Sequence, residues 1–455
     1  MKTMNIMKQI RLNTAMCVLS VLALVSCDKD AHENEYPLPA GQGGIIVGLQ
    51  TETPQDGVES LTLYLFDSDG TVARRKAYTD PRTLASEHIP APVGSYTPVV
   101  VANADPASLP QQTTPADLTQ WLKERTAQYP DLLTASAQTE IRTGEITRIR
   151  MTLKQGTDGI ALIPVRLLLT VPGKNLPPVR SRAASSPDET KTLRCVAEVF
   201  MKGTENRIHR REMQCERQAD GRYLAVLSLL PGEYDLRLWT DWTDAGTAIG
   251  KYYIVDDLHH VTVNTDPYTA GAETDDKDAY FAVQSLRVDG EVQDEPVTLI
   301  RPLARYRLVA TDVEAYGKLV EKENYPPIER LTVRIIYEGF FPTGFDVATG
   351  KPNDALDTRI SYTDTPTEAK GYAPAEVLQV GADFVLTNGT ESFVTVTVEM
   401  TDAATGEVVS RSTGIRIPYR RGHLTTVSGH LLTAGKTSGG VQIDTEWGDE
   451  IIVEF

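Results

Sequence analysis

The chain contains few of the residues from which metal centres, redox sites and stacked aromatic surfaces are built. Its 455 residues include four cysteines, seven histidines and four tryptophans, and aromatic residues make up 7% of the chain. No two cysteines stand at the spacing of a zinc site. Neither the zinc-protease helix motif nor the G-x-S-x-G nucleophile motif occurs. The sequence therefore predicts no metal site, no cofactor and no catalytic residues.

Positive charge is also scarce. The chain has 45 Lys and Arg against 62 Asp and Glu, and its formal net charge is −17. Nucleic acids and anionic headgroups both attract clustered Lys and Arg, so this balance argues against either as an electrostatic partner. Residues 1–26 carry three basic and no acidic side chains, so their removal would take the net charge to −20. We therefore exclude nucleic acid from the expected partners.

Long hydrophobic runs are confined to the N-terminus. The apolar stretch from Thr14 to Ser26 has about 13 residues, whereas a membrane-spanning helix needs about 20. Basic residues precede it, as in a secretory signal peptide. Leu24-Val-Ser-Cys27 resembles a bacterial lipobox, in which the cysteine is acylated and becomes the mature N-terminus. We expect a signal peptide over 1–26 and a lipid such as palmitate on Cys27; secretion with an incidental Cys27 is the alternative.

The residue pattern of the remaining sequence is typical of several β-sandwiches. Removal of the signal leaves 429 residues, enough for about three domains. Short β-branched runs recur between turns that contain Pro, Gly and Asp, which is typical of sandwiches. The predicted organisation is a tether over 27–43, module one over 44–171, a linker over 172–190, module two over 191–308 and module three over 309–455.

One or two short helices interrupt the strands. Thr114 is the predicted N-cap of the first, with Pro115 at its first position. Asp312 is the predicted cap of the second, which must end before Pro326-Pro327.

A short motif recurs in two modules. Pro92-Val-Gly-Ser-Tyr96 and Pro231-Gly-Glu-Tyr234 both lead into a predicted strand. The match raises internal duplication as a hypothesis.

Cys195 and Cys215 would face each other in a predicted hairpin. A hairpin centred on residues 203–207 pairs positions that sum to 410, which puts the two cysteines opposite each other. Their Cα atoms would then lie within the range of about 4.4–6.8 Å that a disulfide needs, and exported proteins reach compartments that permit disulfides. A disulfide and two buried free thiols in neighbouring strands both remain open.

Two further clusters have structural interpretations. Glu273-Thr-Asp-Asp-Lys-Asp278 gathers the oxygen ligands that calcium takes, but it lacks the twelve-residue loop pattern. We predict a solvated turn there. An aromatic group could stack on sugars if it were exposed, but we predict that it is core; it consists of Trp239, Trp242, Tyr252 and Tyr253.

Several segments resemble the fimbrillin-like lipoproteins of Bacteroidetes-type bacteria. They are Tyr234–Trp242, Tyr253–Val263, Asp278–Phe281, Leu299–Ala304, Tyr337–Phe345, Pro418–Val427 and Gly429–Thr433, with Leu63–Gly70 and Pro92–Tyr96 in module one. The acidic stretch 28–35 resembles the tether that sends such lipoproteins to the cell surface. The resemblance implies a mostly β chain of tandem transthyretin-like β-sandwich domains, anchored by lipid in the outer membrane at the cell surface.

The resemblance also implies a part in type V pili, whose subunits join when one donates a strand to its neighbour. In the family, trypsin-like cleavage after an N-terminal Arg removes a strand and opens the receiving groove. Here the first Arg after Cys27 is Arg74, beyond the predicted strand Leu61–Phe66. This departure favours a fimbrial anchor-like or accessory subunit that contributes to adhesion beside other pilus subunits. The alternative is a non-polymerising surface lipoprotein that binds glycans or host ligands.

The C-terminus carries two segments with alternating apolar residues, separated by the turn residues Gly448-Asp449. They are either the closing edge of module three or a donor for another subunit's groove. The residues of this possible strand-exchange segment are Val441, Ile443, Trp447, Ile451, Val453 and Phe455.

Overall fold

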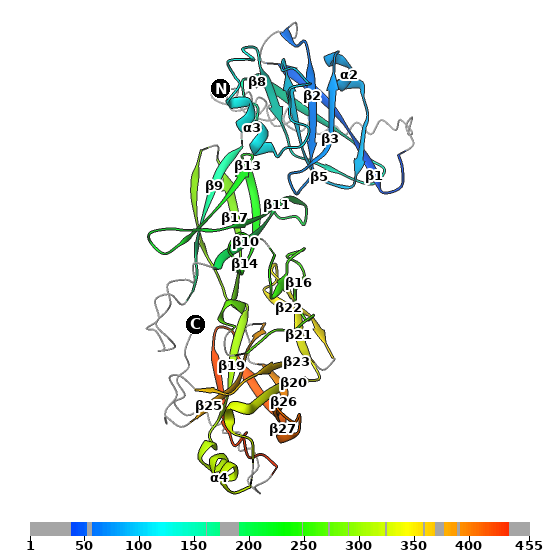
Figure 1. The fold of residues 1–455 in the computed structure, drawn as a ribbon. Helices are drawn as coiled ribbons and strands as arrows, with labels where there is room; N and C mark the ends of the chain where they lie inside the picture. The colour runs from blue at the N-terminus through cyan, green and yellow to red at the C-terminus, as the bar shows by residue number, and fades with distance from the viewer. Residues whose placement is uncertain are drawn as a thin grey trace, which may run out of the picture.

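The computed structural model describes residues 38–51, 57–160, 162–172, 191–247, 249–271, 274–289, 291–323, 325–357, 360–368, 377–388 and 392–435. These residues form mostly β-strands, as predicted. Three sandwich modules follow one another along an elongated molecule, from module one in blue and cyan to module three in yellow and red (Figure 1). Within the described ranges, no helix is long and apolar enough to cross a membrane.

Module one is an 8-stranded sheet whose halves enclose a core that includes Ile45, Leu63 and Val100. The strand order is β3-β2-β5-β6-β8-β1-β4, and β7 pairs with β5. The strands are β1 (Gln42–Thr51), β2 (Leu61–Phe66), β3 (Val72–Tyr78), β4 (Ile89–Pro92), β5 (Gly94–Ala102), β6 (Leu133–Ser136), β7 (Thr139–Ile141) and β8 (Ile146–Gln155); the helices are α2 (Pro81–Ser86) and α3 (Pro115–Lys123).

Module two consists of the sheets β11-β10-β14-β17 and β12-β13-β9-β18. Its strands are β9 (Ile163–Thr170), β10 (Lys191–Met201), β11 (Arg207–Gln214), β12 (Glu216–Arg217), β13 (Tyr223–Leu229), β14 (Gly232–Asp244), β17 (Ala279–Val288) and β18 (Gln293–Thr298). Module one was predicted to extend to residue 171, but β9 hydrogen-bonds to β13 and β18 of module two. The first strand of module two therefore precedes the predicted linker.

Module three consists of the sheets β24-β25-β19-β28 and β23-β20-β26-β27. Its elements are β19 (Leu303–Ala310), α4 (Val313–Glu323), η3 (Ile328–Arg330), β20 (Leu331–Glu338), β23 (Ser361–Asp364), β24 (Thr367–Glu368), β25 (Leu378–Leu386), β26 (Ser392–Asp402), β27 (Val408–Tyr419) and β28 (Leu424–Gly429). Since β19 pairs with β25 and β28, module three begins earlier than the predicted residue 309.

The first strand of every module occupies the same position. β1 is antiparallel to β4 and parallel to β8. β9 is likewise antiparallel to β13 and parallel to β18, and β19 is antiparallel to β25 and parallel to β28. The last strand of each module thus lies beside its first, and the three modules are variations of one topology.

Of the two predicted helix caps, Thr114 forms the expected hydrogen bond and Asp312 does not. The Thr114 hydroxyl accepts a hydrogen bond from the Asp117 N–H at 3.2 Å, as predicted for an N-cap. The Asp312 carboxylate instead accepts hydrogen bonds from the Leu432 and Thr433 backbone N–H groups, at 3.2 and 2.7 Å. Asp312 therefore holds the chain that leaves β28, a contact across 121 residues that no local pattern indicates.

Modules two and three share a hydrophobic core. Its centre is Trp239 of β14, which is fully buried and lies 5.2 Å from the Tyr253 ring and 5.9 Å from the Phe345 ring. Phe384 of module three belongs to the same core. A small sheet covers it, made of β15 (Tyr253–Ile254), β16 (Val261–Val263), β21 (Phe341–Asp346) and β22 (Lys351–Leu356). The prediction that the aromatic group is core is confirmed for Trp239, Tyr252 and Tyr253, whereas Trp242 is half-buried and packs against the core of module two.

The predicted solvated turn at residues 273–278 is right for the exposed Asp275 but wrong for its end, because Lys277 and Asp278 are buried. Lys277 ends the short helix η2 (Asp275–Lys277) and is 1% exposed. Its Nζ donates to Asp383 of module three at 2.7 Å, and burial lowers the pKa of Lys277. Arg301 donates two hydrogen bonds to the Asp278 carboxylate, at 2.7 and 2.6 Å. The Lys277–Asp383 pair ties module two to module three, and the Asp278–Arg301 pair holds the chain just before β19.

The repeated motif forms the same local structure twice. The Tyr96 hydroxyl donates to the Pro92 carbonyl at 3.0 Å, and the Tyr234 hydroxyl donates to the Leu230 carbonyl at 2.7 Å. Each buried tyrosine thus closes the turn before its strand by a bond to the residue four positions upstream, as a tyrosine corner does. The two strands, β5 and β14, occupy equivalent places in their modules.

We expect Tyr96→Phe and Tyr234→Phe each to lower the free energy of unfolding by about 1–2 kcal/mol, since each leaves a carbonyl without its donor. In urea denaturation, Tyr96→Phe should shift the transition of module one and Tyr234→Phe that of modules two and three. Tyr129→Phe is the control, because the Tyr129 hydroxyl meets only the exposed Ser108 hydroxyl. Equal shifts for all three variants would contradict the prediction.

Candidate functional site

β1 is the strand of module one that strand exchange would concern. Ile45 and Val47 are fully buried, and both edges of β1 are hydrogen-bonded, one to β4 and one to β8. Removal of β1 would expose an apolar groove and two rows of unpaired backbone groups. A strand from another chain could satisfy the same groups.

Two glycines allow β1 to fit. A Cβ on Gly43 would lie 2.1 Å from the Arg142 carbonyl oxygen, and a Cβ on Gly44 would lie 1.8 Å from His88 Nε2. The backbone contact at Gly43 cannot be relieved by a side-chain movement. A strand that takes the place of β1 therefore needs glycine at the position of Gly43. The pair of glycines at the start of an apolar run is the signal from which the close approach could have been predicted.

Cleavage after Arg74 would not open a groove for a single strand. It lies in β3, and its guanidinium donates to the Pro90 carbonyl at 2.9 Å. Cleavage after Arg74 would detach both β1 and β2, and every residue of β2 is buried. Such a cut would remove the centre of the sheet rather than one exchangeable strand.

The predicted lipid and strand-exchange residues lie outside the described residues. They are Cys27 and the C-terminal set Val441, Ile443, Trp447, Ile451, Val453 and Phe455.

The predicted pairing of Cys195 with Cys215 is wrong by two residues. Cys195 pairs with Met213, because the turn lies earlier than predicted: Phe200 already pairs with Arg207, and the bulge between Val199 and Phe200 restores only one residue of the difference. Both cysteines are free thiols and buried. Two effects raise the pKa of Cys195: the larger is a hydrogen bond with the Cys215 thiol, and the next is burial. The high pKa keeps Cys195 protonated, so it is a poor nucleophile.

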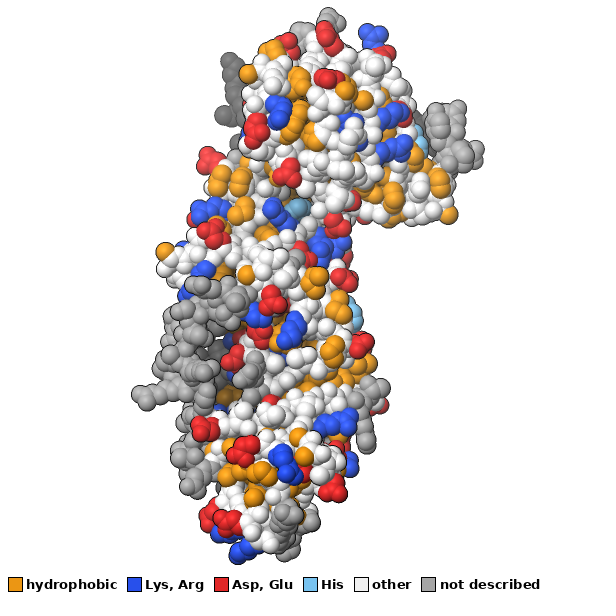
Figure 2. Space-filling model, viewed as in Figure 1, with side chains coloured by type: hydrophobic (Ala, Val, Ile, Leu, Met, Phe, Trp, Pro, Cys, Tyr) orange, Lys and Arg blue, Asp and Glu red, His pale blue; other side chains and the backbone are white. Residues whose placement is uncertain are grey.

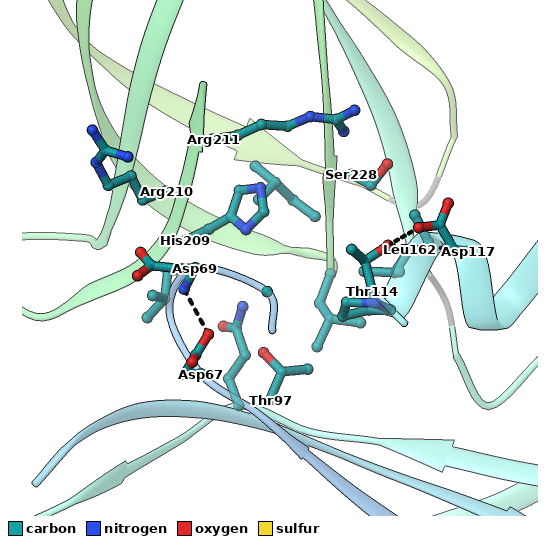
Figure 3. A pocket seen from close by; sticks show the side chains of 17 residues that line it. Asp67, Asp69, Thr97, Thr114, Asp117, Leu162, His209, Arg210, Arg211 and Ser228 are labelled. Carbon is teal, nitrogen blue, oxygen red and sulfur yellow. Dashed lines mark hydrogen bonds between the residues drawn. The ribbon is translucent and has the colours of Figure 1, made fainter. Parts of the chain in front are cut away.

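A cleft lined by both polar and apolar side chains lies between modules one and two (Figure 3). Its volume is about 210 Å³. The turn 67–70 and the start of α3 supply the module-one wall, while β11 and the β13–β14 turn supply the other. The modules touch beside it through polar contacts: the Arg210 N–H donates to the Ser68 carbonyl at 2.7 Å, and Arg207 lies 3.8 Å from Asp69. This junction contrasts with the shared apolar core of modules two and three.

His209 projects from β11 into the cleft (Figure 3). Its Nε2 is buried and has no hydrogen-bond partner among the described residues. Burial, and then the positive charge of Arg211, lowers the pKa of His209 to about 4. The imidazole is therefore neutral at neutral pH, and its buried nitrogen can bind a further group.

The charges around the cleft are mixed. Asp67 is occupied locally, since its carboxylate accepts bonds from the Asp69 N–H at 3.0 Å and from the Thr71 N–H at 2.9 Å. Arg210 points away from the cleft, and its guanidinium donates to the Val255 carbonyl at 2.6 Å (Figure 3). Acidic and basic side chains are also interspersed over the molecular surface (Figure 2). In the described part of the chain, no three His, Cys, Asp or Glu residues form a group that could hold a metal ion.

We expect stability to fall as the pH drops from about 6.5 to about 4. In that window the unfolded chain binds a proton at residue 209, at the ordinary histidine pKa of about 6.5, and the folded chain does not. Unfolding in urea at pH 7 and pH 4.5 should give a loss of roughly 2 kcal/mol that His209→Gln abolishes. His430→Gln is the matched control, because His430 is exposed. A wild-type pH dependence in His209→Gln would refute the assignment.

Two family models match the chain. Residues 158–455 match a family of unknown function (DUF6562), and residues 44–166 match the fimbrillin-A associated anchor proteins Mfa1 and Mfa2. No curated protein sequence matches the chain. The two matches overlap at residues 158–166, and Leu162 of this stretch lines the cleft.

Solved structures with low overall similarity include the fimbrial anchor protein Mfa2 from Porphyromonas gingivalis, at 13% identity over 55% of this chain and 82% of that one, with a TM-score of 0.30. A candidate adhesin from Bacteroides ovatus is 14% identical over 62% of this chain and 90% of that one, with a TM-score of 0.34. The resemblance to fimbrillin-like proteins is confirmed by the match of module one to the anchor proteins. Through modules two and three, the chain belongs to the family of unknown function DUF6562.

Proposed function

We propose that the protein is a non-enzymatic fimbrial anchor or accessory subunit, held at the cell surface by lipid on Cys27 and joined to other pilus subunits by strand exchange. The observation that carries the proposal is the match of residues 44–166 to fimbrial anchor proteins. The position of β1, paired on both edges and buried, supports strand exchange as the mode of assembly.

This subunit would not receive a strand. β1 fills its own groove, and the first Arg after the signal peptide is Arg74, where cleavage would also detach the buried β2. Because module one keeps β1, the groove of this chain stays closed.

The C-terminus has the pattern of a donor. Gly439-Gly-Val-Gln-Ile443 repeats the order of Gly43-Gly-Ile-Ile-Val47, with two glycines followed by apolar residues at alternate positions. The first glycine of β1 is needed where the strand passes the Arg142 carbonyl. A groove like that of module one would accept the C-terminal segment for the same reason. A subunit that donates and does not accept would stand at one end of a pilus, a place that suits an anchor.

We expect Gly439→Val to abolish SDS-resistant laddering in surface extracts, because a Cβ at the matching position of β1 would clash with backbone. Ser438→Val is the matched control and should keep the ladder, since the residue before the glycine pair in β1 is Gln42, which already has a side chain. Thermal melting of both monomers should equal that of wild type. If Gly439→Val unfolds the monomer, the segment is an edge of module three and not a donor.

Cys27→Ala should leave the protein unprocessed or release it from the membrane, because the apolar run is too short to anchor it stably. Detergent phase partition and mass spectrometry of the N-terminal peptide measure this. Cys17→Ala, within the signal peptide, should keep the lipid. A mature wild-type protein that begins at unmodified Asp28 or Ala31 would disprove lipidation.

A further inference from the structure

The cleft between modules one and two has the size of a single small ring. Pockets for drug-sized ligands hold about 300–1,000 Å³, whereas this cavity holds about 210 Å³. Both modules contribute walls, so a bound molecule would be enclosed on two sides.

Three polar side chains of the cleft can take a ligand as a hydrogen-bond partner. His209 Nε2 is buried and has no partner among the described residues. The hydroxyls of Thr97 and Ser228, both partly buried, line the same cleft. Because a buried polar atom without a partner is destabilising, His209 Nε2 favours a ligand that hydrogen-bonds to it, and the two hydroxyls beside it suit a ligand with several hydroxyls.

The same cavity has an apolar side. Leu162, Ile208 and Leu229 line it together with the polar groups. A pyranose ring has this dual character, because its C–H face is apolar and its rim carries hydroxyls that both donate and accept.

Other ligand classes fit less well. A polyanion would meet the Asp67, Asp69 and Asp117 carboxylates that line the cleft. A cation would meet Arg211, and a purely aliphatic molecule would leave His209 Nε2 unpaired.

We infer that this cleft binds the ring of a neutral sugar, either as a free monosaccharide or as the terminal residue of a glycan. Thr97, His209 and Ser228 bind its hydroxyls, and Ile208 and Leu229 contact its C–H face. The site uses both modules and is independent of strand exchange.

Saturation-transfer NMR of the full mature chain with the methyl glycosides of glucose, galactose and mannose tests the inference. One or more should bind with a dissociation constant on the order of millimolar, as expected for a small ligand without aromatic stacking. Thr97→Val and His209→Leu should each weaken binding at least about fivefold. Thr152→Val, on the exposed face of β8, is the control and should bind like wild type.

The possible outcomes separate the alternatives. No saturable binding of any glycoside at tens of millimolar would overturn the inference, as would equal binding by wild type and the cleft variants when thermal melting shows that both variants fold. A polysaccharide retained equally by wild type and Thr97→Val would place glycan binding elsewhere and also overturn it. Binding of the methyl glycosides but not of polysaccharide ends would support a free monosaccharide. SDS-resistant laddering of the same variants measures strand exchange independently of sugar binding. A failure of the sugar-binding inference therefore leaves the proposed strand exchange testable, and the reverse also holds.

Discussion

Each module depends on a first strand whose two edges are both hydrogen-bonded inside its sheet. The N–H and C=O groups of an interior strand need partners, and β1, β9 and β19 each pair with one parallel and one antiparallel neighbour; for β1 the antiparallel pairing covers Gln42–Ile45. The first strand of a module therefore cannot be lost without exposing two rows of backbone groups and the apolar floor beneath them. The constraint that closes each sandwich is also what makes strand exchange physically possible.

The two junctions between modules are held by different forces. Trp239 and Phe384 join modules two and three in one apolar core, and the buried pair Lys277–Asp383 crosses the same boundary. Removal of one member of a buried ion pair leaves an uncompensated charge, which costs roughly 3–5 kcal/mol. Module one, in contrast, meets module two through polar contacts around a cleft. The single family model over residues 158–455 matches this division, with modules two and three as one unit.

Local signals predicted local structure well. The Thr114 cap, the paired tyrosine motifs and the burial of Trp239 follow from spacing, turn chemistry and aromatic content. Features set by distant partners were missed, since the burial of Lys277 depends on Asp383, 106 residues away. The hairpin register failed because the turn lies earlier than predicted, with Phe200 paired to Arg207, and β9 was assigned to the wrong module because its pairing partners lie beyond the linker. No sequence pattern indicated the cleft, because the walls of the cleft come from two different modules.

A ligand bound between two modules also affects how the modules are arranged relative to each other. Because both walls contribute contacts, the ligand binds only the arrangement in which the modules are together, and it stabilises that arrangement by mass action. The junction of modules one and two has polar contacts, whereas modules two and three share an apolar core, so a ligand in the cleft acts on the junction without a shared core. Module one is also the module that follows the predicted lipid anchor in the sequence. A sugar in the cleft would therefore bear on how modules two and three project from an anchored module one.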